Sequence, residues 1–120
     1  MDESKLNKVI EKILKDIRIG FYQLIVLKII VDKGQLHGYA VRKAIQDLSS
    51  GRLNPSESTI YDTLKKLEKY GLIEGFWAQS PLGGPMRKYY KAKKEAKMIL
   101  DQVLKELEEL NKIIKGSKDD

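Results

Sequence analysis

Hydroxyl and lysine side chains gather between Asn54 and Lys69, in a segment whose chemistry suits nucleic acid. Short hydroxyls can hydrogen-bond to base edges, and lysines can contact phosphates. Asn54, Pro55 and Glu57 form a helix-start pattern, because Asn54 can cap free amides, proline fits the first helical position and Glu57 stands at the capping-box position. The pattern predicts a helix from about Pro55 to Gly71. Its outward side chains near the first turns are Ser56, Ser58, Thr59, Asp62, Lys65 and Lys66, with Tyr61 at the border of the apolar stripe.

The segment after Gly71 changes to the period of a strand. Residues 72–78 and 86–91 are short, aromatic-rich runs, and the Pro-Leu-Gly-Gly-Pro stretch between them predicts a hairpin with a tight tip. Arg87 and Lys88 make the return strand basic. A basic hairpin beside a capped helix is what a wing that touches phosphates or the minor groove requires.

Three motifs, in this order along the chain, resemble the PadR-like family of transcriptional regulators. They are HGYAV at 37–41, STIYDTLKKLEKYGLIE at 58–74 and GGPMRKYY at 83–90. The resemblance implies a mainly α fold with a small β-hairpin: a winged helix-turn-helix domain with a long C-terminal dimerisation helix, acting as a homodimeric repressor. A small-molecule effector is possible on the same grounds. The chain departs from the family pattern at Ser58, where glycine is frequent, and at 92–96, where Ala-Lys-Lys-Glu-Ala replaces Thr-Glu-Lys-Gly.

The candidate partner is therefore double-stranded DNA, read as an inverted repeat by two copies of the chain. The helix would enter the major groove, and the wing would reach the flanking backbone or minor groove. Tyr39 and Tyr61 match tyrosines of the family motifs. Burial in the core is an equally good interpretation of Tyr39, and a half-buried structural role is an equally good interpretation of Tyr61. We expect one group of side chains to contact base edges or nearby phosphates: Ser56, Ser58, Thr59 and Lys65. We expect a second group to contact mainly phosphates: Tyr39, Arg52, Lys66, Arg87 and Lys88.

The elements that must position this face can be read from apolar spacing. An amphipathic helix is predicted over 4–17, and Gly20 is expected to separate it from a core helix over 21–32 that is apolar nearly all round. A third helix opens at 37–39 and carries Val41, Ala44, Ile45 and Leu48 on its apolar side. His37 is favoured as a helix cap or packed side chain, and Trp77, Tyr89 and Tyr90 as hairpin packing rather than a ligand cage.

A last helix, about 93–115, carries apolar residues at alternating steps of four and three, which is a heptad seam. The alternative is a helix buried within its own chain. We divide the chain into an amphipathic helix (1–20), a winged-helix domain (21–92) and a dimerisation helix with a frayed tail (93–120). The predicted dimerisation residues are Leu100, Val103, Leu107, Leu110 and Ile114.

The composition of the chain excludes some classes of function. The net charge is +6, and residues 51–94 hold nine basic and four acidic side chains, whereas 95–120 hold five and seven. There is no cysteine and one histidine, so thiolate metal sites are excluded, and we expect no metal, no cofactor and no catalytic residues. The most apolar run is interrupted by Lys28 and is too short to span a bilayer, so we expect a cytoplasmic protein. A winged-helix module that binds another protein, or DNA without sequence preference, is the alternative function.

Overall fold

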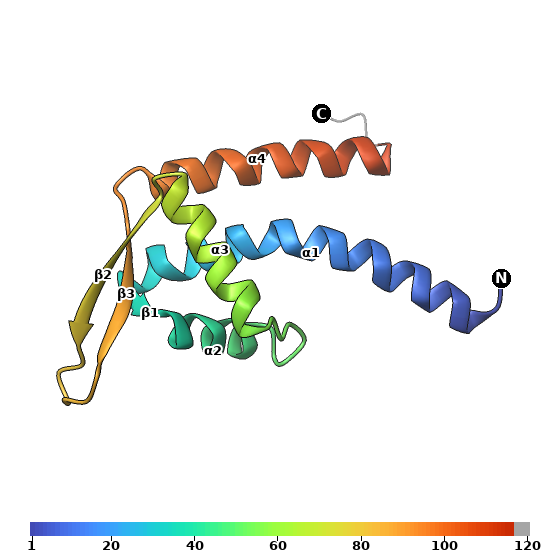
Figure 1. Cartoon of the computed structure of the whole chain (residues 1–120). Coiled ribbons are helices and arrows are strands. Elements are labelled where there is room, and N and C mark those ends of the chain that lie inside the picture. The colour runs from blue at the N-terminus through green and yellow to red at the C-terminus, as the bar shows by residue number, and fades with distance from the viewer. Residues whose placement is uncertain (117–120) are drawn as a thin grey trace.

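The computed structural model describes residues 1–116, which form four helices and a three-stranded antiparallel sheet (Figure 1). In chain order the elements are α1 (Glu3–Lys33), β1 (Gln35–His37), α2 (Gly38–Leu48), α3 (Glu57–Lys69), β2 (Ile73–Gln79), β3 (Met86–Ala92) and α4 (Ala96–Lys115). Helices α2 and α3 are the helix-turn-helix pair, and β2 and β3 form the wing. The predicted fold class is confirmed.

Helix α1 runs unbroken through Gly20, so the predicted break there is wrong. A single glycine inside a helix lowers the stability of the helix by about 1 kcal/mol relative to alanine, and adjacent residues that favour a helix can offset this loss. The Asp2 side chain accepts the Lys5 N–H at 2.8 Å and caps the start of α1, and Arg18 pairs with Glu11 at 2.8 Å. The amphipathic segment and the core helix thus form one continuous helix, and Gly34 is its C-cap.

The core lies where the second half of α1 meets α2, α3 and the sheet. Val26 and Ile30 of α1 are fully buried, as predicted for the core helix. They pack in one cluster with Val41 and Ile45 of α2, while Leu48 is 72% exposed and the prediction that it lies on the packed side is wrong. The apolar stripe of α3 completes the cluster with Ile60, Leu64 and Leu67. Helix α3 is therefore fixed from beneath by apolar packing.

The sheet has the order β1-β3-β2, with β3 in the centre. Ile73 pairs with Ala92 at the base of the wing and Gln79 with Met86 near its tip, which confirms both predicted strands to within one residue. Strand β1 was not predicted, because three residues are too few to show a strand period. It pairs with β3 and joins the start of α2 to the base of the wing.

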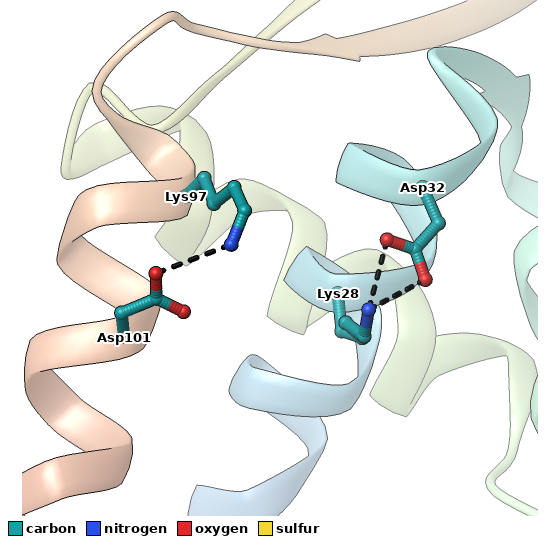
Figure 2. Close-up of polar contacts among 4 residues, drawn as sticks. All are labelled: Lys28, Asp32, Lys97 and Asp101. Atoms are coloured by element: carbon teal, nitrogen blue, oxygen red, sulfur yellow. Dashed lines mark hydrogen bonds and ion pairs between the residues drawn. The ribbon is translucent and has the colours of Figure 1, made fainter.

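Helix α4 begins in the core and then leaves it. Ala96 and Leu100 are buried, whereas Ile114 is 83% exposed. Figure 2 shows two ion pairs that stay within their own helices, Lys28 with Asp32 on α1 and Lys97 with Asp101 on α4. Exposed pairs of this spacing contribute about 0.3–0.5 kcal/mol each, so apolar contacts decide how the helices pack. The tail predicted to fray lies at 117–120, outside the described residues, apart from Gly116, which ends α4.

Candidate nucleic-acid interface

Helix α3 begins two residues later than predicted. Its N-cap is Ser56, whose Oγ accepts the Thr59 N–H at 3.1 Å, and Glu57 is the first helical residue. Asn54 is not the cap because its side-chain oxygen accepts from Gln46 of α2 at 2.5 Å instead. The prediction that Asn54 caps the helix and Pro55 opens it is therefore wrong.

Arg42 of α2 was missed by the sequence analysis, and it holds the entry to α3. Its Nε donates to the Pro55 carbonyl at 2.9 Å, and its Nη2 donates to Asn54 Oδ1 at 3.4 Å. These bonds tie α2 to the loop before α3, so they set where α3 starts. A lone arginine on a helix gives no sign of a partner 13 positions away, and no sequence signal could have found this one.

The predicted base-reading residues are not equally placed. Ser58 and Lys65 are exposed, whereas Thr59 is half-buried and lines a hollow with Ile19 and Gln23 of α1. The Ser56 hydroxyl lies 2.9 Å from the Thr59 hydroxyl and 3.2 Å from that of Ser58, so these three oxygens form one cluster at the helix start. Lys66 is exposed and lines the same hollow beside α1.

A hollow of about 520 Å³ lies between the start of α2, one side of α3 and the wing, and we call it the wing hollow. Its lining brings together five of the predicted residues from three separate segments. Those five are Tyr39, Tyr61, Lys65, Arg87 and Lys88. Arg52, in the loop between α2 and α3, is exposed but does not line the hollow.

Aromatic side chains stand exposed around the wing hollow. Tyr39 is 64% exposed, Tyr61 43% and Trp77 65%. Burial in the core was the alternative for Tyr39, and its exposure contradicts that alternative. The exposure of Tyr61 fits the half-buried alternative, and Trp77 is exposed although it pairs with Lys88 within the hairpin. The Tyr61 ring lies against Gly38, where an added Cβ would come within 2.9 Å of it. Rings with free faces can contact sugars and bases, which fits a nucleic-acid surface.

His37 caps α2, which confirms the interpretation favoured from sequence. Its Nδ1 accepts the Ala40 N–H at 3.3 Å, and its ring meets that of Tyr89 edge-on with centroids 5.5 Å apart. Partial burial, and next the positive charge of Arg87, lower the pKa of His37 from its ordinary value of 6.5. The neutral ring is thus the form that the fold prefers.

That shift predicts a pH dependence of stability. Because the folded pKa is below the unfolded one, the contribution of His37 is fully present above pH 6.5 and is lost as pH falls through the folded pKa. His37→Asn keeps a good capping side chain that does not titrate. The wild type should lose more thermal stability than the variant between pH 7.5 and 5. Parallel losses in thermal melts would contradict the role of His37.

A second surface lies between α1 and α4. An apolar groove of about 710 Å³, here called the α1–α4 groove, is lined by Ile17, Phe21, Leu24, Val103 and Leu107, among others. Leu110 and Ile114 lie exposed further along α4. Leu100 differs from the other predicted dimerisation residues, because only 3% of it is exposed and it belongs to the core of its own chain.

On the amino-terminal half of α1, five large apolar side chains are also 42–56% exposed. They are Leu6, Val9, Ile10, Ile13 and Ile17. Over residues 1–116, no helix is long and apolar enough to cross a bilayer, and no group of three or more histidine or carboxylate side chains could hold a metal ion.

Comparison with known proteins identifies the family. The model of the transcriptional regulator PadR-like family matches residues 26–98. Uncharacterized protein X of Lysinibacillus sphaericus is 31% identical over 99 residues, which make up 82% of this chain and 89% of that protein. A transcriptional regulator from Clostridium thermocellum superimposes with a TM-score of 0.72 at 25% identity, over 87% of this chain and 96% of that chain. A PadR family transcriptional regulator from Eggerthella lenta shares the fold with a TM-score of 0.78 at 21% identity, over 98% and 99% of the two chains. The chain belongs to the PadR-like family of transcriptional regulators, winged-helix proteins that regulate transcription by binding DNA.

Proposed function

We propose that the protein is a homodimeric repressor that binds an inverted-repeat operator in the cytoplasm. One α3 from each protomer enters the major groove, and each wing meets the flanking backbone or minor groove. The two half-sites lie about one helical turn, roughly 34–36 Å, apart. The observation that carries the proposal is the wing hollow, where cations and exposed rings from α2, α3 and the wing face the same space.

Within this interface the side chains divide by chemistry and position. Ser58 and Lys65 are exposed on α3 and serve base edges or nearby phosphates. Thr59 joins them through the hydroxyl cluster at the helix start. Arg87 and Tyr39, at the rim of the wing hollow, serve the phosphate backbone. Arg52, Ser56, Tyr61 and Lys66 flank this set and complete the proposed contact surface.

Dimerisation is supported by the apolar surface that the single chain leaves open. The α1–α4 groove continues into exposed apolar side chains on both helices, and single exposed residues are ordinary but long stripes are not. Val103, Leu107, Leu110 and Ile114 present the heptad side of α4 to a second copy. We assign the groove to that second copy rather than to an effector, because the same stripe extends beyond it along both helices.

Selection from random-sequence duplex DNA, followed by sequencing of the bound fraction at two salt concentrations, tests the proposal. We expect an inverted repeat to be enriched and its binding to weaken steeply with salt, since phosphate contacts release counterions. Salt-sensitive binding without an enriched motif would instead favour an architectural DNA-binding protein. Absence of binding at both salt concentrations would favour the protein-interaction module.

A further inference from the structure

Lys88 of the wing is directed toward the recognition helix. Its Nζ lies 3.6 Å from Oε1 of Glu68 on α3, and the two side chains are 38% and 31% exposed. The same Nζ lies 5.5 Å from the centre of the Tyr90 ring, two positions along β3. Lys88 is therefore already engaged by a carboxylate and an aromatic ring of its own chain.

Gly75 of β2 makes room for this arrangement. A Cβ at position 75 would lie 2.5 Å from Cε of Lys88, 3.0 Å from Oε2 of Glu68 and 3.3 Å from the Tyr90 ring. The lysine stem thus crosses the sheet directly over the glycine. Position 75 has no left-handed φ, so this crossing is what an added side chain would disturb, and the outer part of the Lys88 side chain would have to move.

The outer half of the wing has little else to hold it. Figure 1 shows the hairpin projecting beyond the helices, and Trp77, Leu82 and Met86 are 65%, 99% and 57% exposed. Among the ion pairs of residues 1–116, the one between Lys88 and Glu68 is the one that joins α3 to the wing. Arg87 directly precedes Lys88 in β3, so the contacts that fix the angle of this hairpin also position Arg87.

We propose that Lys88 is a positioning residue that braces the wing against α3 through Glu68, with Gly75 leaving the space that the lysine crosses, and that it does not contact DNA. This replaces the phosphate contact predicted for Lys88 from the sequence. The role of this brace rests on the proposed DNA-binding function, because the brace holds Arg87 at a fixed angle to α3 for contact with DNA. The negative charge of Glu68 also contributes, after burial, to the raised pKa of Tyr90, as a carboxylate held beside the ring should.

The brace can be tested in the protein alone, because Trp77 is the single tryptophan and lies directly across from Lys88 in the sheet. We expect Gly75→Ala, Glu68→Gln and Lys88→Met each to lower the fluorescence anisotropy of Trp77, as the wing gains motion. Gly75→Ala is the sharpest variant, since it changes no charge and alanine would otherwise stiffen the strand. Arg87→Met is the matched control and should leave the anisotropy unchanged. Unchanged anisotropy in Gly75→Ala and Glu68→Gln would overturn the brace.

Binding to the selected operator gives the second test. Lys88→Met should weaken binding about two- to fivefold, the range of a partly exposed ion pair, and leave the slope of log K against log salt unchanged. Arg87→Met should flatten that slope by about 0.9, the value for one lost phosphate contact. An equal flattening by Lys88→Met would show that Lys88 contacts DNA and overturn the proposal. If the wild type binds no DNA, the proposed function fails, while the anisotropy still decides the brace.

Discussion

Val103→Asp is expected to convert the protein to monomers and to weaken operator binding at least about a hundredfold. Val103 lines the α1–α4 groove and is 38% exposed in the single chain, so a carboxylate there is tolerated by the protomer. In the proposed dimer the same carboxylate would be buried without a partner, which costs about 3–5 kcal/mol. Two linked heads gain roughly 10²–10⁴ in affinity over one, and monomers lose that gain.

Sedimentation velocity measures the oligomeric state, and titration of the selected operator measures the affinity. Lys105→Asp is a strict control, because it changes the charge by more and lies about 200° around the same helix at an exposed position. The control should remain dimeric and bind within a few-fold of the wild type. A dimeric Val103→Asp protein would place the protomer contact somewhere other than this groove.

Local chemistry was sufficient to predict most elements of this fold. The stripe of Ile60, Leu64 and Leu67 predicted α3 and its buried side, and all three are 2% exposed or less. Aromatic alternation and the Gly-Gly tip predicted both wing strands. The stop at Gly71 follows from its left-handed backbone, with φ of 78°. In each case the determining interactions lie within a few residues of one another.

Two features near the candidate site were not predicted because partners distant in the sequence decide them. Helix α3 starts later than predicted because two side chains of α2 hydrogen-bond to the residues before it. Gln46 donates to the Asn54 side chain, and Arg42 donates to the Pro55 carbonyl. The ion pair of Lys88 with Glu68, 20 positions earlier, was likewise not predicted, because no local pattern in the sequence links the two residues. Such contacts depend on how the elements pack, and a single sequence does not contain that information in readable form.

The candidate site shows the same division. Tyr39 and Arg87 could be proposed from side-chain chemistry and the family motifs, and they do line one hollow. The structure brings Phe21 and Tyr70 to the α1–α4 groove from elements other than α4, and no pattern in the last helix indicates this. Residue content of one helix does not determine the lining of a groove between several.

Leu64→Ala is expected to lower the free energy of unfolding by about 3 kcal/mol, within the roughly 2–5 kcal/mol typical of buried leucines. Leu64 is fully buried beneath the recognition helix, and its removal leaves a cavity as well as lost apolar contact. Leu82→Ala deletes the same atoms at the wing tip, where the side chain is 99% exposed, and should change stability by less than about 0.5 kcal/mol. Urea unfolding followed by circular dichroism, at one fixed protein concentration because dimer stability depends on it, measures both. Of these two leucines, only Leu64 packs α3 against the core. Similar losses in the free energy of unfolding from both substitutions would mean that packing beneath α3 does not hold this helix in place.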